Sequence, residues 1–522
     1  MQWLHEQLRE ERSLQLATSS REIKKYLLCW MQPARSLTIS SSGIKRDLLL
    51  GFLLMLCWFR PSSCAFLSSS RFYRLKARSV PCQFPAYQSS FGKLFSTPKR
   101  SITRSVGPNQ HDSTMASQTK ASMVARRVTR AQLVECGDRL RRGDLVAFPT
   151  ETVYGLGCHA LDPSAVQKVF EAKERPLTDP LIVHVAQTQD ALKLWVPHDE
   201  SIRILQILCD EFWPGPLTLV APAAPQVPSI IMADTGFVAC RCPMHPLAQS
   251  LLQEARVPIA APSANKFGHV SPTQADHVLD DLGQENVWVL EDTERTSPEE
   301  AACQIGVEST VAKLEINTKE KTNSQLLQQR YTLTVLRQGA ISIKQMATCL
   351  EKAGRSDVDV TGLSCRMVEE TEATVAPGQS IKHYSPRIPS FLLGPDLITE
   401  VDCANQDKGE DEWNHLLQQS IILDFGGRLA AWKSTAKQYR DLSPSSDSSQ
   451  AAQCVFEALR WAERIDESAT YIIFPQVASN FHDSCQDYDA LTLALNDRLT
   501  RAASGVVLDS LVSVQNLLVG RE

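Results

Sequence analysis

The chain has 522 residues, more than one hydrophobic core usually holds, so we expect two or more domains. Apolar residues make up 43% and charged residues 22%, which excludes a wholly disordered or fibrous chain. The net charge of −5, from 54 basic and 59 acidic residues, excludes the global basic field typical of nucleic-acid-binding proteins. The fifteen cysteines form no C-x-x-C pair, which argues against a zinc ribbon and indicates a reduced intracellular compartment.

The first 130 residues differ from the rest, and we expect them to form a targeting or disordered extension (1–130). Residues 60–134 contain thirteen Lys and Arg, a single acid and many Ser, the composition of an organellar transit peptide. The apolar run before them, 48–59, is too short for a membrane helix, which needs about 20 residues, but fits the core of a signal peptide. This order resembles the bipartite plastid signal of algae with secondary plastids, with Phe66 at the cleavage point.

Two other interpretations of the extension remain open. The apolar run lies far from Met1, so residues 1–44 can come from an over-extended start site. Met115 can also begin a cytosolic form. The expected location is therefore an organelle, plastid or mitochondrion, if the extension is real, and the cytoplasm if translation starts near Met115. No membrane anchor is expected in the mature form.

From residue 131 onward, segments with helical and strand-like apolar spacing alternate, which indicates an α/β fold. The spacing predicts helices over 131–142, 162–175, 190–196, 201–213, 245–256, 451–465 and 489–504, and strands over 145–150, 180–185, 217–223, 236–243, 257–265, 309–315, 331–337, 390–394, 420–426 and 470–475. Asp162 is the expected N-cap of the helix predicted over 162–175. The helix predicted over 489–504 is expected to be the last one. A polar stretch, 315–330, predicts a solvated hairpin insertion.

Two short motifs carry side chains suited to phosphates. Lys173 and Arg175 end a predicted helix just before Pro176, and a Lys point charge with an Arg fork two residues on commonly holds phosphates. Cations near a helix C-terminus also simply complement the helix dipole. Ser263 and Asn265, in A-P-S-A-N, alternate on an extended segment and should therefore point the same way. Ordinary turn chemistry explains the same two residues.

Other motifs supply hydroxyls and buried cations. Thr150 and Thr152 lie in the turn F-P-T-E-T-V-Y-G-L-G, where bonding to the local backbone is the ordinary alternative. Arg241 lies in an apolar strand, where an unpaired charge is costly, so it must find an anion. Capture of a ligand carboxylate and a structural ion pair are both open. G-V-E-S-T and the later L-R-Q-G-A-I add Ser309 and Arg337.

Taken in this order, the motifs resemble those of the YrdC-like threonylcarbamoyl-AMP synthases. The resemblance covers a catalytic domain at 131–345, a linker and active-site lid at 346–388 with the motif A-P-G-Q-S-I-K-H-Y-S-P, and a C-terminal domain at 389–522 that contains A-L-N-D-R-L-T-R-A-A-S-G. It implies a YrdC-like twisted open mixed sheet with helices, followed by the linker and a smaller Rossmann-like α/β domain.

The resemblance also implies an activity. The family joins L-threonine, bicarbonate or CO2 and ATP into threonylcarbamoyl-AMP and releases pyrophosphate. The product feeds N6-threonylcarbamoyladenosine formation at position 37 of tRNAs that read ANN codons, through a downstream tRNA threonylcarbamoyl-transfer complex, with a weak tRNA contact expected. Adenylation depends on positioning and charge neutralisation. We expect Mg2+ to be held by the ATP phosphates and no metal site on the protein.

The family's functional residues fall on identifiable positions. By resemblance, the catalytic residues are Lys173, Arg175, Ser263 and Asn265. ATP would be bound by Arg175, Asp179, Phe237, Ser263, Ser271, Arg337 and Tyr384, with Tyr384 and His383 folding over the site as a lid. Threonine would be bound by Thr152, His184, Ala261, Ser309 and Arg241, the last holding its carboxylate.

The chain departs from the family at three places, and two other functions compete. The stretch before G-V-E-S-T is long and acidic, with Asp292 where members often have D-G-G; the linker is less basic around Lys382; and Phe237 stands where some members have Thr. A carbamoyl-transfer protein of the hydrogenase-maturation type would carry Cys-pair zinc fingers, which are lacking. A non-catalytic double-stranded RNA or tRNA-binding module fits poorly with the acidic net charge.

Overall fold

The structure is a computed structural model that describes residues 124–291, 293, 303–317, 330–362, 374–377, 384–398, 410–478 and 488–519. The predictions on residues 1–123, on Asp292, Lys382 and His383, and on the tip of the hairpin 315–330 lie outside the described residues. The remaining elements alternate as an α/β protein, and they form two sheets, which we use to define a first and a second domain.

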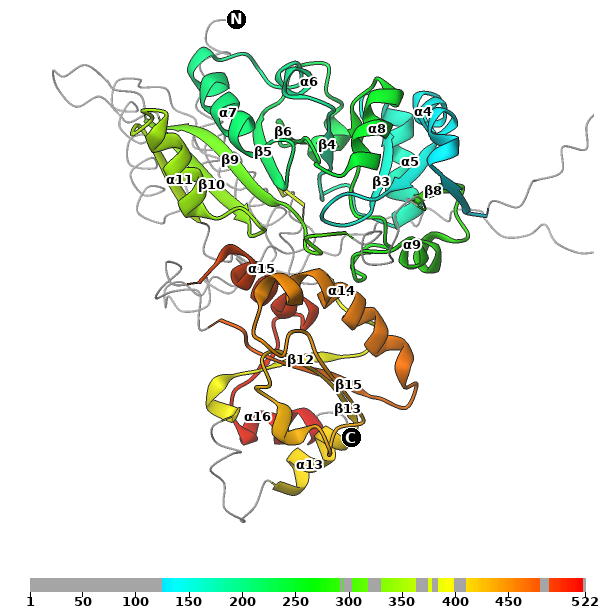
Figure 1. Cartoon of the computed structure of the whole chain (residues 1–522), viewed down its shortest axis with the longest axis vertical. Helices are drawn as coiled ribbons and strands as arrows, with labels where there is room; N and C mark the ends of the chain where they lie inside the picture. The colour runs from blue at the N-terminus through cyan, green and yellow to red at the C-terminus, as the bar shows by residue number, and fades with distance from the viewer. Residues whose placement is uncertain are drawn as a thin grey trace, which may run out of the picture. The chain divides into compact units, whose positions relative to one another are not determined.

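The first domain is built on an eleven-stranded mixed sheet (Figure 1). Its strands are β1 (Arg126–Thr129), β2 (Leu145–Phe148), β3 (Gly155–His159), β4 (Ile182–His184), β5 (Leu217–Pro222), β6 (Phe237–Arg241), β7 (Ile259–Ala260), β8 (Val287–Glu291), β9 (Thr310–Asn317), β10 (Arg330–Arg337) and β11 (Val358–Gly362). They lie in the order β1-β8-β2-β3-β7-β4-β6-β5-β9-β10-β11. Neighbours such as β4 and β6 are parallel, whereas β5 and β6 are antiparallel, so the expected mixed sheet is confirmed.

Helices pack on this sheet. They are α4 (Leu133–Arg141), α5 (Pro163–Lys173), α6 (Thr188–Leu192), α7 (Asp199–Phe212), α8 (Pro246–Ala255), α9 (Ala275–Leu282) and α11 (Ile343–Lys352). Asp162 caps α5 as predicted, because its side chain accepts a hydrogen bond from the Ser164 amide and Pro163 occupies the first turn. The helix predicted over 190–196 ends earlier, at Leu192, and Trp195 instead forms a bridge with Ala223.

The sheet extends past both boundaries expected for the catalytic domain, residues 131 and 345. The strand β1 pairs in parallel with β8, and β11 pairs in parallel with β10. Both are edge strands with one buried residue each, Val128 and Val358, so they lack the apolar alternation that identifies a half-buried strand. The segment expected to be linker, 346–388, therefore begins inside the helix α11 and includes the strand β11.

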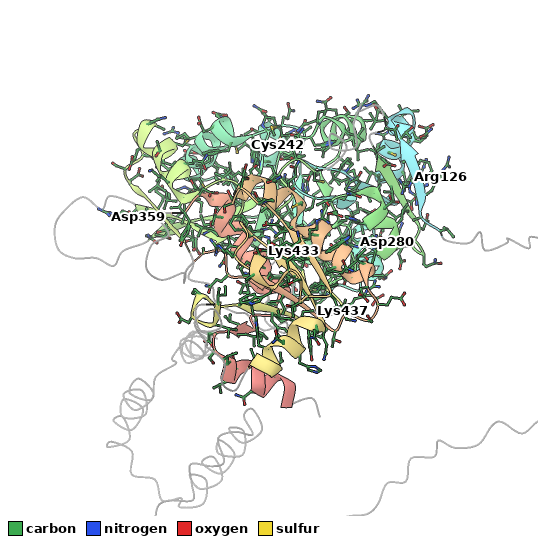
Figure 2. The ribbon with its side chains drawn as sticks, turned by 60° about the horizontal axis from the view of Figure 1, so that its bottom comes forward. Arg126, Cys242, Asp280, Asp359, Lys433 and Lys437 are labelled. Carbon is green, nitrogen blue, oxygen red and sulfur yellow. The ribbon has the colours of Figure 1, made fainter. Side chains whose placement is uncertain are left out.

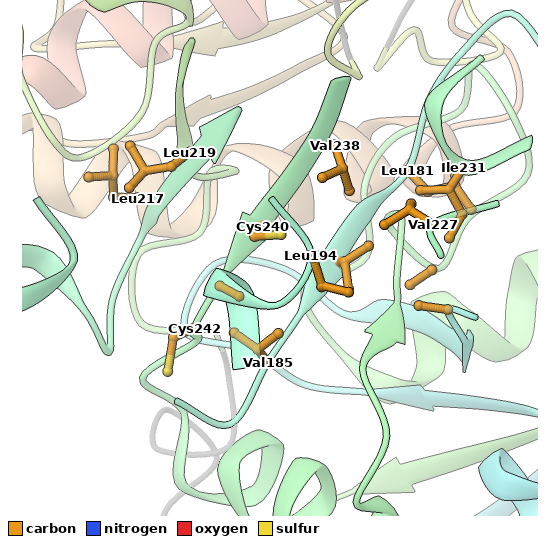
Figure 3. Close-up of a cluster of buried hydrophobic side chains, with 14 of the residues drawn as sticks. Leu181, Val185, Leu194, Leu217, Leu219, Val227, Ile231, Val238, Cys240 and Cys242 are labelled. Atoms are coloured by element: carbon orange, nitrogen blue, oxygen red, sulfur yellow. The ribbon is translucent and has the colours of Figure 1, made fainter. Parts of the chain in front are cut away.

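The main core lies on one face of the sheet. Alternate strand residues such as Leu217, Leu219, Val238 and Cys240 belong to this core, together with Ile231 of the short 3-10 helix Ser229–Met232 (Figure 3). Successive strand residues point to opposite faces, so their neighbours in sequence face the other side. On that other face, two smaller clusters form, one around α4 and α8 and one around β5, β6 and β9. The functional site described below occupies the same face as these two clusters.

The second domain is a five-stranded parallel sheet in the order β14-β13-β15-β12-β16. Its elements are β12 (Ser390–Leu393), α13 (Glu410–Gln418), β13 (Ser420–Asp424), β14 (Gln438–Asp441), α14 (Ser448–Ile465), β15 (Tyr471–Pro475), α15 (Ala490–Ala502), β16 (Val507–Leu508) and α16 (Leu511–Val519). Helices α14 and α15 cover one face and α13 and α16 the other (Figure 1). The expected smaller α/β domain is confirmed, but α15 is not the last helix, because α16 follows it.

Among the described residues, no helix combines the length and apolar character needed to cross a membrane. No disulfide joins the cysteines of the described ranges, and six of these eight side chains are buried. Burial raises the pKa of the buried thiols of Cys136, Cys158, Cys209 and Cys240, to about 12 at Cys136, so they behave as small apolar side chains.

Candidate functional site

A cavity of about 500 Å³, counting solvent at its mouth, opens on the sheet face opposite the main core. It is lined by Thr150, Thr152, Val153, Gly155, Arg175, Ile182, His184, Arg241, Ala261, Pro262, Ser263, Glu308, Ser309, Arg337, Pro377 and Tyr384. The lining therefore contains three guanidinium groups and, among acidic side chains, one carboxylate. Such a cavity favours anionic ligands.

Strand alternation places His184 and Arg241 in this cavity. Val183 of β4 and Cys240 of β6 pack into the main core, so the residues after them face the opposite side. His184 and Arg241 are also register partners across the parallel pair β4 and β6. The two side chains are therefore neighbours in the cavity because of pairing that joins segments far apart in the sequence.

A β-bulge places Arg337. Along β10, Leu333 and Val335 face the main core, and strict alternation would turn Arg337 the same way. The register with β9 shifts between Val335 and Arg337, so that Arg337 pairs with Val311, which faces the other side. A bulge re-aims a side chain in this manner. Arg337 consequently lines the cavity.

Arg241 is held in a buried network. Its Nη1 donates to Thr152 Oγ1 at 2.9 Å, its Nε donates to the Gly215 carbonyl at 3.2 Å, and its Nη2 lies 2.7 Å from Glu151 Oε1. The exposed fractions of the Arg241 and Glu151 side chains are 4% and 2%. The structural ion pair that the sequence left open therefore exists, and the guanidinium also lines the cavity. Glu151 was not predicted.

His184 is neutral at physiological pH. Full burial, with the neighbouring charge of Arg241 as a smaller cause, lowers the pKa of His184 to about 3. A neutral imidazole beside the Arg241 guanidinium can accept a hydrogen bond from a ligand hydroxyl or ammonium group.

Ser309 links the two sides of the cavity. Its hydroxyl lies 2.8 Å from Thr218 Oγ1 and accepts a hydrogen bond of 3.1 Å from Arg337 Nη2. The Nε of Arg337 donates to the Ser309 carbonyl at 3.1 Å. Burial lowers the pKa of Arg337, and its described hydrogen bonds go to Ser309 and to the Pro377 carbonyl rather than to a carboxylate. The guanidinium is thus positioned for an incoming anion.

Arg175 reaches the cavity from the end of α5. Its side chain pairs with Asp179, with 2.9 Å between Nη2 and Oδ2, and donates to the Asp179 and Pro180 carbonyls. Asp179 does not line the cavity. In this structure it acts behind Arg175, where it fixes the direction of the guanidinium.

Lys173 and Asn265 lie behind the lining rather than in it. Lys173 Nζ donates to the Ser263 carbonyl at 2.6 Å and to the Asn265 carbonyl. The Asn265 amide donates to the Lys266 and His269 carbonyls. The prediction that Ser263 and Asn265 point the same way is therefore wrong, because β7 ends at Ala260 and the chain turns after Ser263.

Two further predicted residues lie outside the lining. Phe237 packs against Lys313, whose Nζ lies 3.9 Å from the centre of its ring. Ser271 Oγ donates to Glu308 Oε1 at 2.6 Å, so it supports a lining residue without lining the cavity itself. Glu308 was not predicted, although it lies in G-V-E-S-T. No sequence signal separated Glu308 from a surface acid.

Tyr384, a residue of the expected lid, lines the cavity. Its backbone has a φ of 63°, in the left-handed region that bulky residues rarely adopt. The ring is buried and lies 5.4 Å, centre to centre, from Phe456 on α14. Tyr384 is thus anchored by the second domain.

Comparisons with known proteins address the same regions. Residues 138–328 match the family model described as telomere recombination, and residues 341–504 match the model of the threonylcarbamoyl-AMP synthase C-terminal domain. The threonylcarbamoyl-AMP synthase of Bacillus subtilis is 32% identical over 388 residues, which cover 72% of this chain and 94% of that protein. The chain belongs to the two-domain threonylcarbamoyl-AMP synthase family.

Other relatives agree. The threonylcarbamoyl-AMP synthase of Pyrococcus abyssi is 38% identical over 47% of this chain and 63% of that protein. A crystal structure of Pyrococcus abyssi Sua5 complexed with L-threonine has a TM-score of 0.56 at 28% identity, and the match covers 74% of this chain and 99% of that one. This threonylcarbamoyl-AMP synthase family member is therefore an enzyme of tRNA modification, and its interpretation as an RNA-binding module without catalysis is not favoured.

Proposed function

We propose that the cavity joins L-threonine, bicarbonate or CO2 and ATP into threonylcarbamoyl-AMP and releases pyrophosphate. The observation that carries this is the convergence of Arg175, Arg241 and Arg337 on one buried cavity that also contains Ser309. The reaction consumes two anionic reactants, a carbamate and a nucleoside triphosphate. Guanidinium forks bind carboxylate and phosphate oxygens in two-pronged geometry.

The threonine side of the site is formed by Thr152, His184, Arg241, Ala261 and Ser309. Arg241 holds the threonine carboxylate, since its fork is fixed by Glu151 and Thr152 at the cavity wall. The neutral imidazole of His184 adds no second charge beside that guanidinium. Arg241 is therefore the cation of this side that lines the cavity, while Glu151 holds it from behind the lining.

The ATP side is formed by Arg175, Ser263, Arg337 and Tyr384. A carbamate oxygen attacks the α-phosphorus, the bond from that phosphorus to the bridging oxygen breaks, and pyrophosphate leaves with the electron pair. The arginines stabilise the charge on the phosphates, and the buried setting strengthens each contact. Lys173, one layer behind, holds the loop of Ser263 and can approach the phosphates if that loop shifts. Asp179, Phe237, Ser271 and Asn265 support the wall.

We propose that Mg2+ arrives with ATP and is held by its phosphate oxygens. Within the described segments, no group of three or more His, Cys, Asp or Glu side chains is arranged to hold a metal ion. The donor set of the cavity, rich in guanidinium and hydroxyl groups, fits a substrate-borne cation better than a protein cage. The ion would neutralise phosphate charge.

The cellular context is also a proposal. The product would pass to a tRNA threonylcarbamoyl-transfer complex, because carbamoyl adenylates hydrolyse readily and need a nearby acceptor. Residues 1–130 would direct the enzyme to a plastid or mitochondrion, as their basic, Ser-rich composition suggests, and a start near Met115 would leave it in the cytoplasm. Fusing 1–130 or 115–130 to a fluorescent protein separates the two: organelle signal is expected with the longer segment alone.

The activity is tested with purified residues 124–522, ATP, Mg2+ and bicarbonate, with and without L-threonine. This fragment begins before β1, so the sheet is complete. Pyrophosphate release that requires threonine, and is weak with serine, is the expected result. Pyrophosphate release that does not depend on threonine would contradict the proposal.

A further inference from the structure

Arg498 belongs to the second domain but contacts the cavity wall of the first. It lies on α15, and its side chain is fully buried. Its Nε donates to Glu308 Oε2 at 2.7 Å, its Nη2 donates to the Gln338 carbonyl at 2.9 Å, and its Nη1 donates to Asp497 Oδ2 at 2.5 Å. Asp497 also pairs with Arg501 on the same helix. The guanidinium carbon of Arg498 lies 5.3 Å from the centre of the Tyr384 ring. Glu308 and Tyr384 line the cavity, and Gln338 directly follows Arg337, which lines it too.

These contacts fall on one side of the cavity. Arg337 and Tyr384 belong to the side that we assign to ATP. Glu308 holds Ser271, a further residue of that side, through a hydrogen bond of 2.6 Å. The contacts described for Arg498 include no residue of the threonine side.

Glu308 needs a cation. Its carboxylate lines a cavity proposed to receive the phosphates of ATP, and a bare negative charge there would repel them. Arg498 provides the opposite charge at hydrogen-bond distance, with exposed fractions of 0% for its own side chain and 7% for that of Glu308. In such a setting the charge interaction is little screened by solvent or salt. The pair therefore makes the wall electrically compatible with a nucleotide.

The backbone of the first domain also contacts the second domain next to Glu308. Gly306, two residues before Glu308, has a φ of +77°, and a Cβ there would lie 2.7 Å from the carbonyl carbon of Gln453 on α14. The glycine allows the strand-forming segment to touch a helix of the second domain directly. The second domain thus shapes the same stretch of wall from two helices, α14 and α15.

We propose that Arg498 is a positioning residue for ATP: from the second domain it neutralises Glu308 and fixes the wall that carries Arg337 and Tyr384. This inference rests on the proposed synthase activity. It gives the second domain a role within the site, in addition to anchoring the lid.

The test compares three variants of residues 124–522. In Arg498→Lys, the charge stays but the fork that joins Glu308 to Gln338 is lost. The KM for ATP and the Kd of a non-hydrolysable ATP analogue are expected to rise about tenfold or more, while the KM for threonine changes less than about threefold. In Arg498→Met, the carboxylate of Glu308 keeps its hydrogen bond from Ser271 but loses its cation, and the loss of ATP affinity is expected to be larger. Adding Glu308→Gln to Arg498→Met removes that charge and should recover at least about threefold in ATP affinity.

Arg464→Ala is the matched control. Arg464 lies on α14 and pairs with Asp280 of α9, labelled in Figure 2, so it joins the same two domains at an exposed site away from the cavity. Its KM values are expected to stay within about twofold of the parent, because surface ion pairs contribute little. Melting temperatures of all variants show whether folding is retained.

The inference is overturned if Arg498→Lys raises the ATP and threonine constants equally, or if Glu308→Gln recovers nothing in the Arg498→Met background. Both results would mean that Arg498 acts on folding alone. Failure of the parent protein to release pyrophosphate with threonine would instead contradict the proposed activity. In that case binding of the ATP analogue still decides the role of Arg498.

Discussion

Glu151 and Arg241 form a buried ion pair, with 2.7 Å between Oε1 and Nη2, at the wall of the cavity. No other described residue pairs with the Glu151 carboxylate, whereas Arg241 also bonds Thr152 and the Gly215 carbonyl. The guanidinium is therefore oriented before any ligand arrives, which is the condition for effective electrostatic recognition. Removing one partner alone would leave the other charged and buried.

Removing the pair as a unit tests Arg241. In the double variant Arg241→Met, Glu151→Gln, the threonine KM is expected to rise about 30- to 100-fold, from the loss of about 2–3 kcal/mol of charge-assisted hydrogen bonding. The ATP KM should change far less. Steady-state pyrophosphate release measures both constants, with the exposed Arg203→Ala as control. Equal increases in the two constants would remove Arg241 from the carboxylate site.

Lys173→Met is expected to lower pyrophosphate release by about 100-fold or more, as the loss of a transition-state contact does. Its melting temperature is also expected to fall, because the carbonyls of Ser263 and Asn265 lose their buried donor, so circular dichroism is needed to show that the variant is folded under assay conditions. Burial, with the nearby charge of Arg175, lowers the pKa of Lys173 well below its usual value, so charging it in the free protein is already unfavourable. Lys168→Met, an exposed change on the same helix, serves as control. Normal turnover of the Lys173 variant would exclude the residue from phosphate binding.

His269 links the two domains in a pH-dependent way. It lies between Asp281 of α9 and Glu463 of α14, with nitrogen–oxygen distances of 2.9 and 3.0 Å. Burial opposes its charge, but the two carboxylates outweigh burial and raise the pKa of His269 above its usual 6.5. The protonated form is favoured by folding, so the stability from this group is complete below about pH 6.5 and is lost as pH rises through the higher folded value.

His269→Gln should therefore lower the melting temperature more at pH 6 than at pH 9, where the parent has itself lost the charge. His415→Gln, on an exposed side chain of α13, is the control. Thermal unfolding at a series of pH values measures the effect. The same loss at both pH values would contradict the charge on His269.

Gly339 lies in L-R-Q-G-A-I, against the backbone of the site. A Cβ there would be 2.6 Å from the Ser309 carbonyl carbon and 2.7 Å from the Glu308 carbonyl oxygen, closer than real contacts allow. Gly339→Ala must shift this backbone, so we expect turnover to fall about tenfold or more, because small displacements at a site are costly. Gly354→Ala is the control. A Cβ there meets no neighbouring atom, so this variant shows only the backbone strain of placing alanine at a positive φ. Unchanged turnover in Gly339→Ala would show that the backbone at Ser309 can shift without loss of activity, which would contradict the prediction.

The sequence predicted the elements whose signals are local. The N-cap of α5 follows from Asp162 and Pro163, and the strands β4 and β6 follow from short apolar runs. Edge strands were missed, because β1 and β11 bury one residue each and carry no alternation. The order of motifs identified the family, since several weak signals in a fixed order are together specific.

The site was predicted in part. Nine of the predicted site residues line the cavity: Thr152, Arg175, His184, Arg241, Ala261, Ser263, Ser309, Arg337 and Tyr384. Lys173, Asn265, Asp179, Ser271 and Phe237 lie outside the lining, and Glu151 and Glu308 were not expected. An acid in a motif looks the same in sequence whether it is solvated or paired with a buried arginine.

Local spacing and motifs along the chain were enough to predict the class of the fold, many of its helices and strands, and the family. Only the tertiary structure decided which side chains meet. The bulge in β10 turns Arg337 to the cavity face, and Arg498 reaches Glu308 across 190 residues of chain. Such contacts depend on strand register and on the packing of one domain against another, which no local pattern encodes.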